Sequence, residues 1–147
     1  MTRNGLLICV FAASLLLGGC SNRSIGNKID DQFLDPDVSS AISAAAPNLS
    51  SPTSHIVTSS YNGVILIAGQ TPEAELKDKA GQAARGVKGV RKVHNELQIQ
   101  QPTSLLVRSN DTLVTSKIKT LMLADSTVPS TRIKVITENG VVFLMGI

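Results

Sequence analysis

The stretch Asn62-Gly63-Val64-Ile65-Leu66-Ile67-Ala68-Gly69 decides the fold of this chain. Asn62-Gly63 separates two β-rich runs, residues 56–61 and 64–68, and supplies the positive φ angles that a tight type I′ turn requires. The sequence therefore predicts a β-hairpin. Both faces of its second strand are apolar, with Val64, Leu66 and Ala68 on one face and Ile65 and Ile67 on the other. One face can pack on helices, and the other also requires cover.

Helical patterns flank this hairpin on both sides. Asp35-Pro36-Asp37 is typical of a helix start, because Asp35 can cap free amides and Pro36 tolerates the first helical position. The apolar stripe of that helix is Val38, Ile42 and Ala45. After the hairpin, Thr71 is the expected cap of a second helix, whose stripe is Leu76, Ala80, Ala83, Ala84 and Val87. The predicted order is helix, strand, strand, helix, strand.

The last strand of this series is expected over residues 90–99. Its alternation places Val93, Leu97 and Ile99 on one face, and His94, Glu96 and Gln98 on the other. Such alternation predicts a half-buried strand.

The same pattern begins again in the C-terminal part. Asn110-Asp111 opens a segment of helical spacing with the stripe Val114, Ile118, Leu121 and Met122. Asn62-Gly63 maps onto Asn139-Gly140, and Gly69 onto Gly146, both offset by 77 residues. Matched offsets indicate an internal duplication. The second copy lacks the helix and strand that follow Gly69, so we expect it to be truncated. The alternative is a half-module with an exposed apolar edge.

The N-terminus carries an apolar run that follows Arg3 and ends at Leu17-Gly18-Gly19-Cys20. At roughly 14 residues this run is too short to span a bilayer and predicts a secretory signal peptide over residues 1–19. Its end resembles the lipobox of bacterial lipoproteins. The resemblance implies that Cys20 is lipidated, and that Ser21 after it permits transport to the outer membrane. Two or three acyl chains anchor a protein stably. Residues 20–34 are then the lipidated cysteine and a tether, with a short ordered arm as the alternative.

Composition argues against several classes of function. Cys9 lies in the leader and Cys20 is the lipidation candidate, so no thiol is left for a disulfide or a metal. The chain has three Phe, one Tyr and no Trp, too few rings for a single-stranded nucleic-acid platform. His55 and His94 lack metal-ligand spacing, and no catalytic motif is present in the sequence. We therefore expect no enzyme activity, no cofactor, no metal and no nucleic-acid partner.

The hairpin stretch, the alanine-rich helix and Val87-Lys88-Gly89-Val90-Arg91-Lys92-Val93-His94-Asn95-Glu96-Leu97 closely resemble the BON-domain family. Residues 87–97 match the family ending Val-x-Gly-Val-x-x-Val-x-Asn-x-Leu at every specified position. The resemblance implies an α+β fold of tandem αββαβ modules, each a small sheet with helices packed on one face. The first module spans residues 35–101, a linker spans 102–109, and a partial second module spans 110–147. The resemblance also implies no catalysis, and binding of anionic phospholipid such as phosphatidylglycerol largely through the second module.

Two sets of residues are candidates for binding. Leu113, Lys117 and Thr120 share one side of the second module's helix, where a leucine can enter the headgroup region while the lysine meets phosphate. In the lipoproteins that the chain resembles, the position of Leu113 holds a membrane-contacting aromatic residue, so weaker binding is expected here. A peripheral core leucine is the alternative. The second set is Lys77, Lys79, Arg85, Lys88, Arg91 and Lys92, whose interspersed acids favour a solvated face.

Together, the resemblances to the lipobox and to the BON-domain family imply a lipoprotein of the outer membrane that faces the periplasm, binds anionic phospholipid through its modules and supports envelope integrity. The rival hypothesis is a periplasmic adaptor that binds envelope proteins, in which only the acyl anchor contacts the membrane. The residues with a predicted structural role in the hairpins are Asn62, Gly63, Gly69, Asn139, Gly140 and Gly146.

Overall fold

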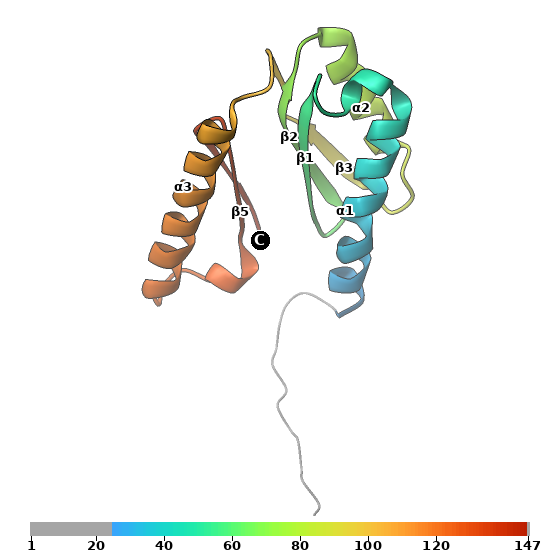
Figure 1. Cartoon of the computed structure of the whole chain (residues 1–147). Helices are drawn as coiled ribbons and strands as arrows, with labels where there is room; N and C mark the ends of the chain where they lie inside the picture. The colour runs from blue at the N-terminus through green and yellow to red at the C-terminus, as the bar shows by residue number, and fades with distance from the viewer. Residues whose placement is uncertain (1–24, 147) are drawn as a thin grey trace, which may run out of the picture.

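A computed structural model describes residues 25–146, with side chains from Asp31 onward, and contains two α+β modules in succession (Figure 1). The first consists of α1 (Ile25–Ala45), β1 (His55–Tyr61), β2 (Val64–Thr71), α2 (Ala74–Arg85), β3 (Lys92–Asn95) and β4 (Gln98–Ile99). The second consists of α3 (Leu105–Ala124), β5 (Lys134–Glu138) and β6 (Val141–Met145). Two short 3₁₀ helices, Pro47–Leu49 and Ser130–Arg132, precede the hairpins. The predicted fold class and order of elements are confirmed.

The sheet of the first module is built around β2. This strand pairs antiparallel with β1 and parallel with both β3 and β4. Helices α1 and α2 cover one face of the sheet, and the core between them contains Val38, Ile42, Ile65, Ile67, Leu76, Ala80, Ala84 and Leu97. The two-faced apolar pattern of β2 therefore reflects burial on both sides, since Leu66 and Ala68 on the other face are also buried.

Helix α1 begins at Ile25, ten residues before the predicted start at Asp35. The prediction of a tether over residues 20–34 is therefore wrong from Ile25 onward, and Pro36 lies inside the helix. An interior proline costs about 3 kcal/mol. The helix continues through it because Leu34, Val38 and Ile42, one turn apart, are all buried in the core. Leu34 thus takes the place in the buried stripe that the sequence assigned to Ala45, which is exposed.

Two further local predictions in the first module are wrong. Thr71 does not cap α2, because β2 extends to Thr71, whose buried hydroxyl accepts a hydrogen bond from the Ser54 hydroxyl at 3.0 Å. The residue at the N-cap is Glu73, without a side-chain cap. The predicted strand over residues 90–99 is interrupted between β3 and β4, where Leu97 enters the core. Ile99 is consequently exposed rather than on the buried face.

Helix α3 also begins earlier than the sequence predicted. Its first residue is Leu105, and the Ser104 side chain caps it by accepting a hydrogen bond from the Val107 amide at 3.4 Å. Most of the predicted linker over residues 102–109 is therefore helical. In the predicted apolar stripe of this helix, three residues are half-buried: Val114, Ile118 and Met122. The fourth, Leu121, is exposed and does not belong to the stripe.

The two hairpin turns have the predicted geometry. Asn62 and Gly63 have φ angles of 50° and 75°, and Asn139 and Gly140 have 49° and 75°. These values are those of type I′ turns. Gly69 also has a positive φ, 114°, whereas Gly146 does not, so the two closing glycines are equivalent in position but not in backbone conformation.

Polar contacts join the two modules. The Lys134 ammonium donates to the backbone carbonyl of Ser60, and the side-chain Nδ2 of Asn139 donates to Oε1 of Gln98 at 2.8 Å. His55 Nε2 lies 3.5 Å from Glu138 Oε2. A groove of about 630 Å³ lies between the modules, lined on one side by Leu66 and neighbouring residues of the first sheet and on the other by residues of β6. The second face of β2 is therefore turned toward the second module, as Figure 1 shows.

Glu138 lies in the contact between the modules, where its carboxylate is 3.5 Å from His55. Burial raises the pKa of Glu138 above its ordinary value of 4.5, while the nearby His55 acts in the opposite direction. A carboxyl group with a raised folded-state pKa destabilises the fold once it is ionised, and this destabilisation grows as pH rises from 4.5 through the raised pKa. We expect Glu138→Gln to melt at a higher temperature than the natural chain at pH 7, with the difference lost below pH 4.5. The exposed Glu96→Gln is the control; equal melting temperatures for both variants at pH 7 would contradict the expectation.

Candidate membrane-binding surface

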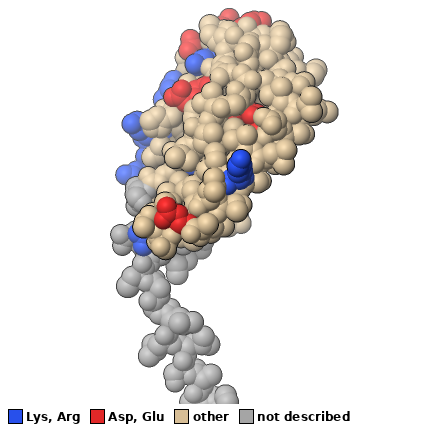
Figure 2. Space-filling view, turned by 90° about the vertical axis from the view of Figure 1, so that its left-hand side faces the viewer, with Lys and Arg blue, Asp and Glu red and all other residues tan. Residues whose placement is uncertain are grey.

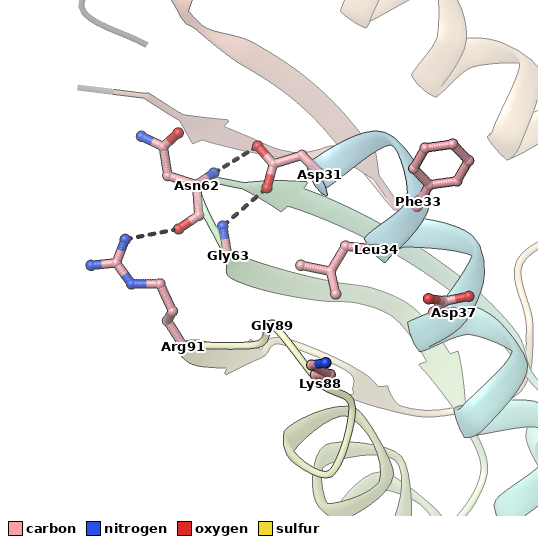
Figure 3. A pocket seen from close by; sticks show the side chains of 9 residues that line it. All are labelled: Asp31, Phe33, Leu34, Asp37, Asn62, Gly63, Lys88, Gly89 and Arg91. Carbon is pink, nitrogen blue, oxygen red and sulfur yellow. Dashed lines mark hydrogen bonds between the residues drawn. The ribbon is translucent and has the colours of Figure 1, made fainter. Parts of the chain in front are cut away.

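A buried aspartate in each module connects the long helix to the hairpin turn. In the first module, Asp31 Oδ2 and Oδ1 accept hydrogen bonds from the amides of Asn62 and Gly63 at 2.8 and 3.0 Å (Figure 3). In the second, Asp111 accepts from the amides of Asn139 and Gly140 at 2.8 and 2.9 Å. Each aspartate is 4% exposed. The carboxylate thus fixes the rotation of the helix on its hairpin, and with it the set of side chains that face outward.

The aspartates define which helix positions are equivalent in the two modules. Counting from them, Leu34, Val38 and Ile42 of α1 correspond to Val114, Ile118 and Met122 of α3. On the outer side, Phe33, Asp37 and Ser40 correspond to Leu113, Lys117 and Thr120. Sequence reasoning missed the aspartates because their partners are far away in sequence. The available signal was an aspartate three residues before an apolar residue of the inner stripe in both helices, Leu34 in α1 and Val114 in α3.

The outer face of α3 is rich in exposed leucines. Five of them are each more than 60% exposed: Leu105, Leu106, Leu113, Leu121 and Leu123. Figure 2 shows this side of the molecule, on which charged side chains are few. Large exposed apolar patches on a protein indicate a contact with a membrane or another protein.

The charges of α3 are distributed unequally between its two faces. Within Leu105–Ala124 the one acidic residue is Asp111, which is buried against the hairpin turn. The basic residues are Arg108, Lys117 and Lys119, and both lysines are exposed. Asp125 follows directly after the helix. Exposed leucines next to lysines, on a helix without an exposed acid, can contact the surface of an anionic membrane.

The three predicted lipid-binding residues lie together on this face. Leu113 is 69% exposed, so the alternative of a peripheral core leucine is wrong. Lys117 and Thr120 are exposed beside it, and the Thr120 hydroxyl donates to the carbonyl of Ser116 at 2.9 Å. Their role in lipid binding stays a prediction. The larger leucine surface around them was missed because Leu105 and Leu106 were assigned to the linker and Leu121 to the buried stripe.

The second predicted set, the basic residues of the first module, separates into two groups. On α2, Lys79 forms an ion pair with Glu75 at 2.8 Å, as expected of a solvated face. Lys88 and Arg91 instead lie in the segment before β3 and line a cavity together with Asn62 and Gly63 of the β1–β2 turn, and Lys92 is the first residue of β3. The Arg91 guanidinium donates to the carbonyl of Asn62 at 3.3 Å.

The remaining predictions concern the N-terminal segment, membrane-spanning helices and metal sites. Cys20 and the predicted signal peptide lie outside the described residues. Within residues 25–146, no helix has the length and hydrophobicity needed to cross a membrane. In the same part of the chain, no group of three or more His, Cys, Asp or Glu side chains is arranged to hold a metal ion.

The geometry defines a class of protein: two related α+β modules, each with a long helix fixed to an Asn-Gly hairpin by a buried aspartate. A family model described as the BON domain matches residues 31–101 and 110–147. The chain belongs to the BON-domain family.

Several known proteins are similar to this chain. The outer membrane lipoprotein DolP of Haemophilus influenzae is 40% identical over 124 residues, which cover 84% of this chain and 63% of that protein. The 21 kDa hemolysin of Actinobacillus pleuropneumoniae is 36% identical over the same shares. The osmotically-inducible protein Y of Escherichia coli is 32% identical over 86% of this chain and 62% of its own length. This chain therefore spans less than two thirds of these relatives.

Proposed function

We propose that this chain is a non-enzymatic lipoprotein of the outer membrane that binds anionic phospholipid through the outer face of α3 and supports envelope integrity. The outer face of α3 carries the proposal, because its leucines are exposed and its exposed charges are basic. Leu113 enters the interface in this proposal, and the ammonium of Lys117 pairs with lipid phosphate. Anionic lipids such as phosphatidylglycerol fit the lysines better than zwitterionic lipids do.

The membrane anchor in this proposal is Cys20. The support is the lipobox-like sequence that ends at Cys20 and the similarity to a protein named as an outer membrane lipoprotein. The acyl chains hold the protein at the bilayer, and α3 adds recognition of the lipid headgroups. In the adaptor alternative the acyl chains provide all of the membrane contact, so α3 would bind an envelope protein instead.

Vesicle flotation of residues 21–147, produced without acyl chains, separates these two functions. We expect flotation with phosphatidylglycerol-containing vesicles and little with zwitterionic ones. High salt should reduce the binding without abolishing it, because salt screens the lysines but not the insertion of leucines. A chain that is folded by circular dichroism and floats with neither vesicle would support the adaptor function.

Replacing one exposed leucine of α3 tests directly whether this helix binds the vesicle. Leu113→Asp should weaken vesicle binding by about 10- to 100-fold, because an interfacial leucine contributes about 1.5–3 kcal/mol and the new carboxylate is repelled by anionic lipid. Folding should be unaffected, since Leu113 is 69% exposed. The matched control is Ile99→Asp, an exposed apolar residue outside α3, which should bind like the natural chain. Equal losses in both variants would contradict a specific role of α3.

A further inference from the structure

The turn end of the first module carries a shallow cavity of about 410 Å³ (Figure 3). Three segments line it: α1, the β1–β2 turn and the residues before β3. The side chains of this lining that a ligand could contact are Phe33 and Asp37 of α1, and Lys88 and Arg91 of the segment before β3. Hydrogen bonds join these segments: the Arg91 amide donates to the Gly63 carbonyl at 2.7 Å, and the Asp31 carboxylate of α1 accepts from the turn amides.

Phe33 is an exposed aromatic residue in the lining of this cavity. It is 65% exposed, whereas its neighbour Leu34 is buried in the core. Figure 3 shows Leu34 directed toward the strands and Phe33 on the outer side of α1. Phe33 is also the position equivalent to Leu113, counted from Asp31 and Asp111. The same outward helix position therefore carries a large apolar side chain in both modules.

The charge around Phe33 is mainly positive. Lys88 and Arg91 line the cavity and are exposed, the exposed Lys92 follows Arg91 directly, and the one exposed acid of the lining is Asp37. The second acid of the cavity, Asp31, is buried and bound to the turn amides. Each basic side chain near an anionic leaflet contributes about 1 kcal/mol. This surface can therefore attract phosphate groups while the aromatic ring lies among the headgroups.

The turn end of the first module lies near the proposed lipid anchor, Cys20, because α1 begins shortly after that cysteine. Ile25, the first residue of α1, lies five positions after Cys20 in the sequence. Even a fully extended segment of that length spans at most about 18 Å. The start of α1 and the β1–β2 turn lie at the same end of the module (Figure 1). Acyl chains on Cys20 would keep this end close to the bilayer and raise the effective concentration of lipid around it.

We infer that Phe33, with Lys88, Arg91 and Lys92, forms a second membrane contact that binds anionic phospholipid at the bilayer surface. The inference rests on the proposed lipid anchor at Cys20 and extends the proposed function from α3 to the first module. Two separate contacts on one anchored chain would fix its orientation on the membrane.

Tryptophan fluorescence tests this contact, because the natural chain contains no tryptophan. The probes are Phe33→Trp, Leu113→Trp and, as a control, Ile99→Trp. Ile99 is 56% exposed and pairs with Thr71, at the end of β2 opposite the turn. The lipidated chain carrying each variant is reconstituted into vesicles that contain brominated phosphatidylglycerol as quencher. We expect Phe33→Trp to lose about half or more of its fluorescence, because an interfacial ring lies about 5–10 Å into the headgroup boundary. Ile99→Trp should stay near its unquenched intensity.

The outcomes separate this inference from the proposed function. Quenching of Leu113→Trp without quenching of Phe33→Trp overturns the inference and leaves α3 as the binding surface. Quenching of Phe33→Trp alone supports the first-module contact and contradicts the proposed role of α3. If neither probe is quenched more than Ile99→Trp, both ideas are overturned.

Charge variants test the lipid chemistry. Lys88→Gln with Lys92→Gln, introduced together into Phe33→Trp, should reduce quenching by brominated phosphatidylglycerol at least about threefold, since two basic side chains that can pair with lipid phosphate are removed. The matched control is Lys79→Gln, which removes an exposed lysine already paired with Glu75 and should leave quenching unchanged. Quenching that is equal in zwitterionic brominated vesicles and insensitive to the double variant would overturn recognition of anionic lipid at this end.

Discussion

Replacing Gly69 with alanine is expected to reduce the free energy of unfolding by about 3 kcal/mol or more. Gly69 has a φ of 114°, a conformation that costs other residues about 1–3 kcal/mol. A Cβ atom there would also lie 2.0 Å from the carbonyl oxygen of His55, which precedes the ladder partner of Gly69, Ile56, on β1. The two strands would have to separate to admit it, at about 1–3 kcal/mol for overpacking. Urea denaturation followed by circular dichroism should show a midpoint lower by about 1–2 M.

Gly86→Ala provides the matched control for this prediction. Gly86 has an ordinary helical φ of −77°, and the nearest atom to its added Cβ lies at 3.4 Å. Alanine there should be neutral, or stabilising by up to about 1 kcal/mol through the lower entropy of the unfolded chain. Equal midpoints for Gly69→Ala and the natural chain would show that β1 and β2 tolerate a side chain at their closing glycine.

Removal of the Asp31 carboxylate should destabilise the first module by about 3 kcal/mol. Asp31→Ala deletes two hydrogen bonds from the amides of Asn62 and Gly63 to a buried charged group, and such bonds contribute about 1.5–3 kcal/mol each. Asp31→Asn should fall between the natural chain and Asp31→Ala, because the amide retains one carbonyl oxygen as an acceptor. Thermal or urea unfolding measures the difference.

The control for this prediction lies on the same helix. Asp37 is exposed, so Asp37→Ala should change stability by less than about 0.5 kcal/mol. The corresponding change in the second module is Asp111→Ala. It should destabilise the β5–β6 hairpin, because it removes the acceptor of the hydrogen bonds from the Asn139 and Gly140 amides. Similar stabilities for Asp31→Ala and Asp37→Ala would contradict the role given to the buried carboxylates.

The candidate binding surface could be predicted only in part from the sequence. Leu113, Lys117 and Thr120 were found because helical spacing places them on one side. The remaining leucines of α3 were not found, because their exposure depends on where the helix begins and how it is rotated on the hairpin. That rotation is fixed by Asp111, whose partners lie 28 and 29 residues away. The equivalence of Phe33 and Leu113 became visible only through the same contact.

The sequence by itself determined the two hairpins, because an Asn-Gly turn between β-rich runs is a local preference of the backbone. It also determined the duplication and the order of elements. Only the tertiary structure decided that α1 continues through position 36, since burial of Leu34, Val38 and Ile42 outweighs the unfavourable proline there. It also decided which side chains face outward, because the contacts of Asp31 and Asp111 join residues about 30 positions apart. Local patterns cannot report such contacts, whose energy appears only when distant segments meet.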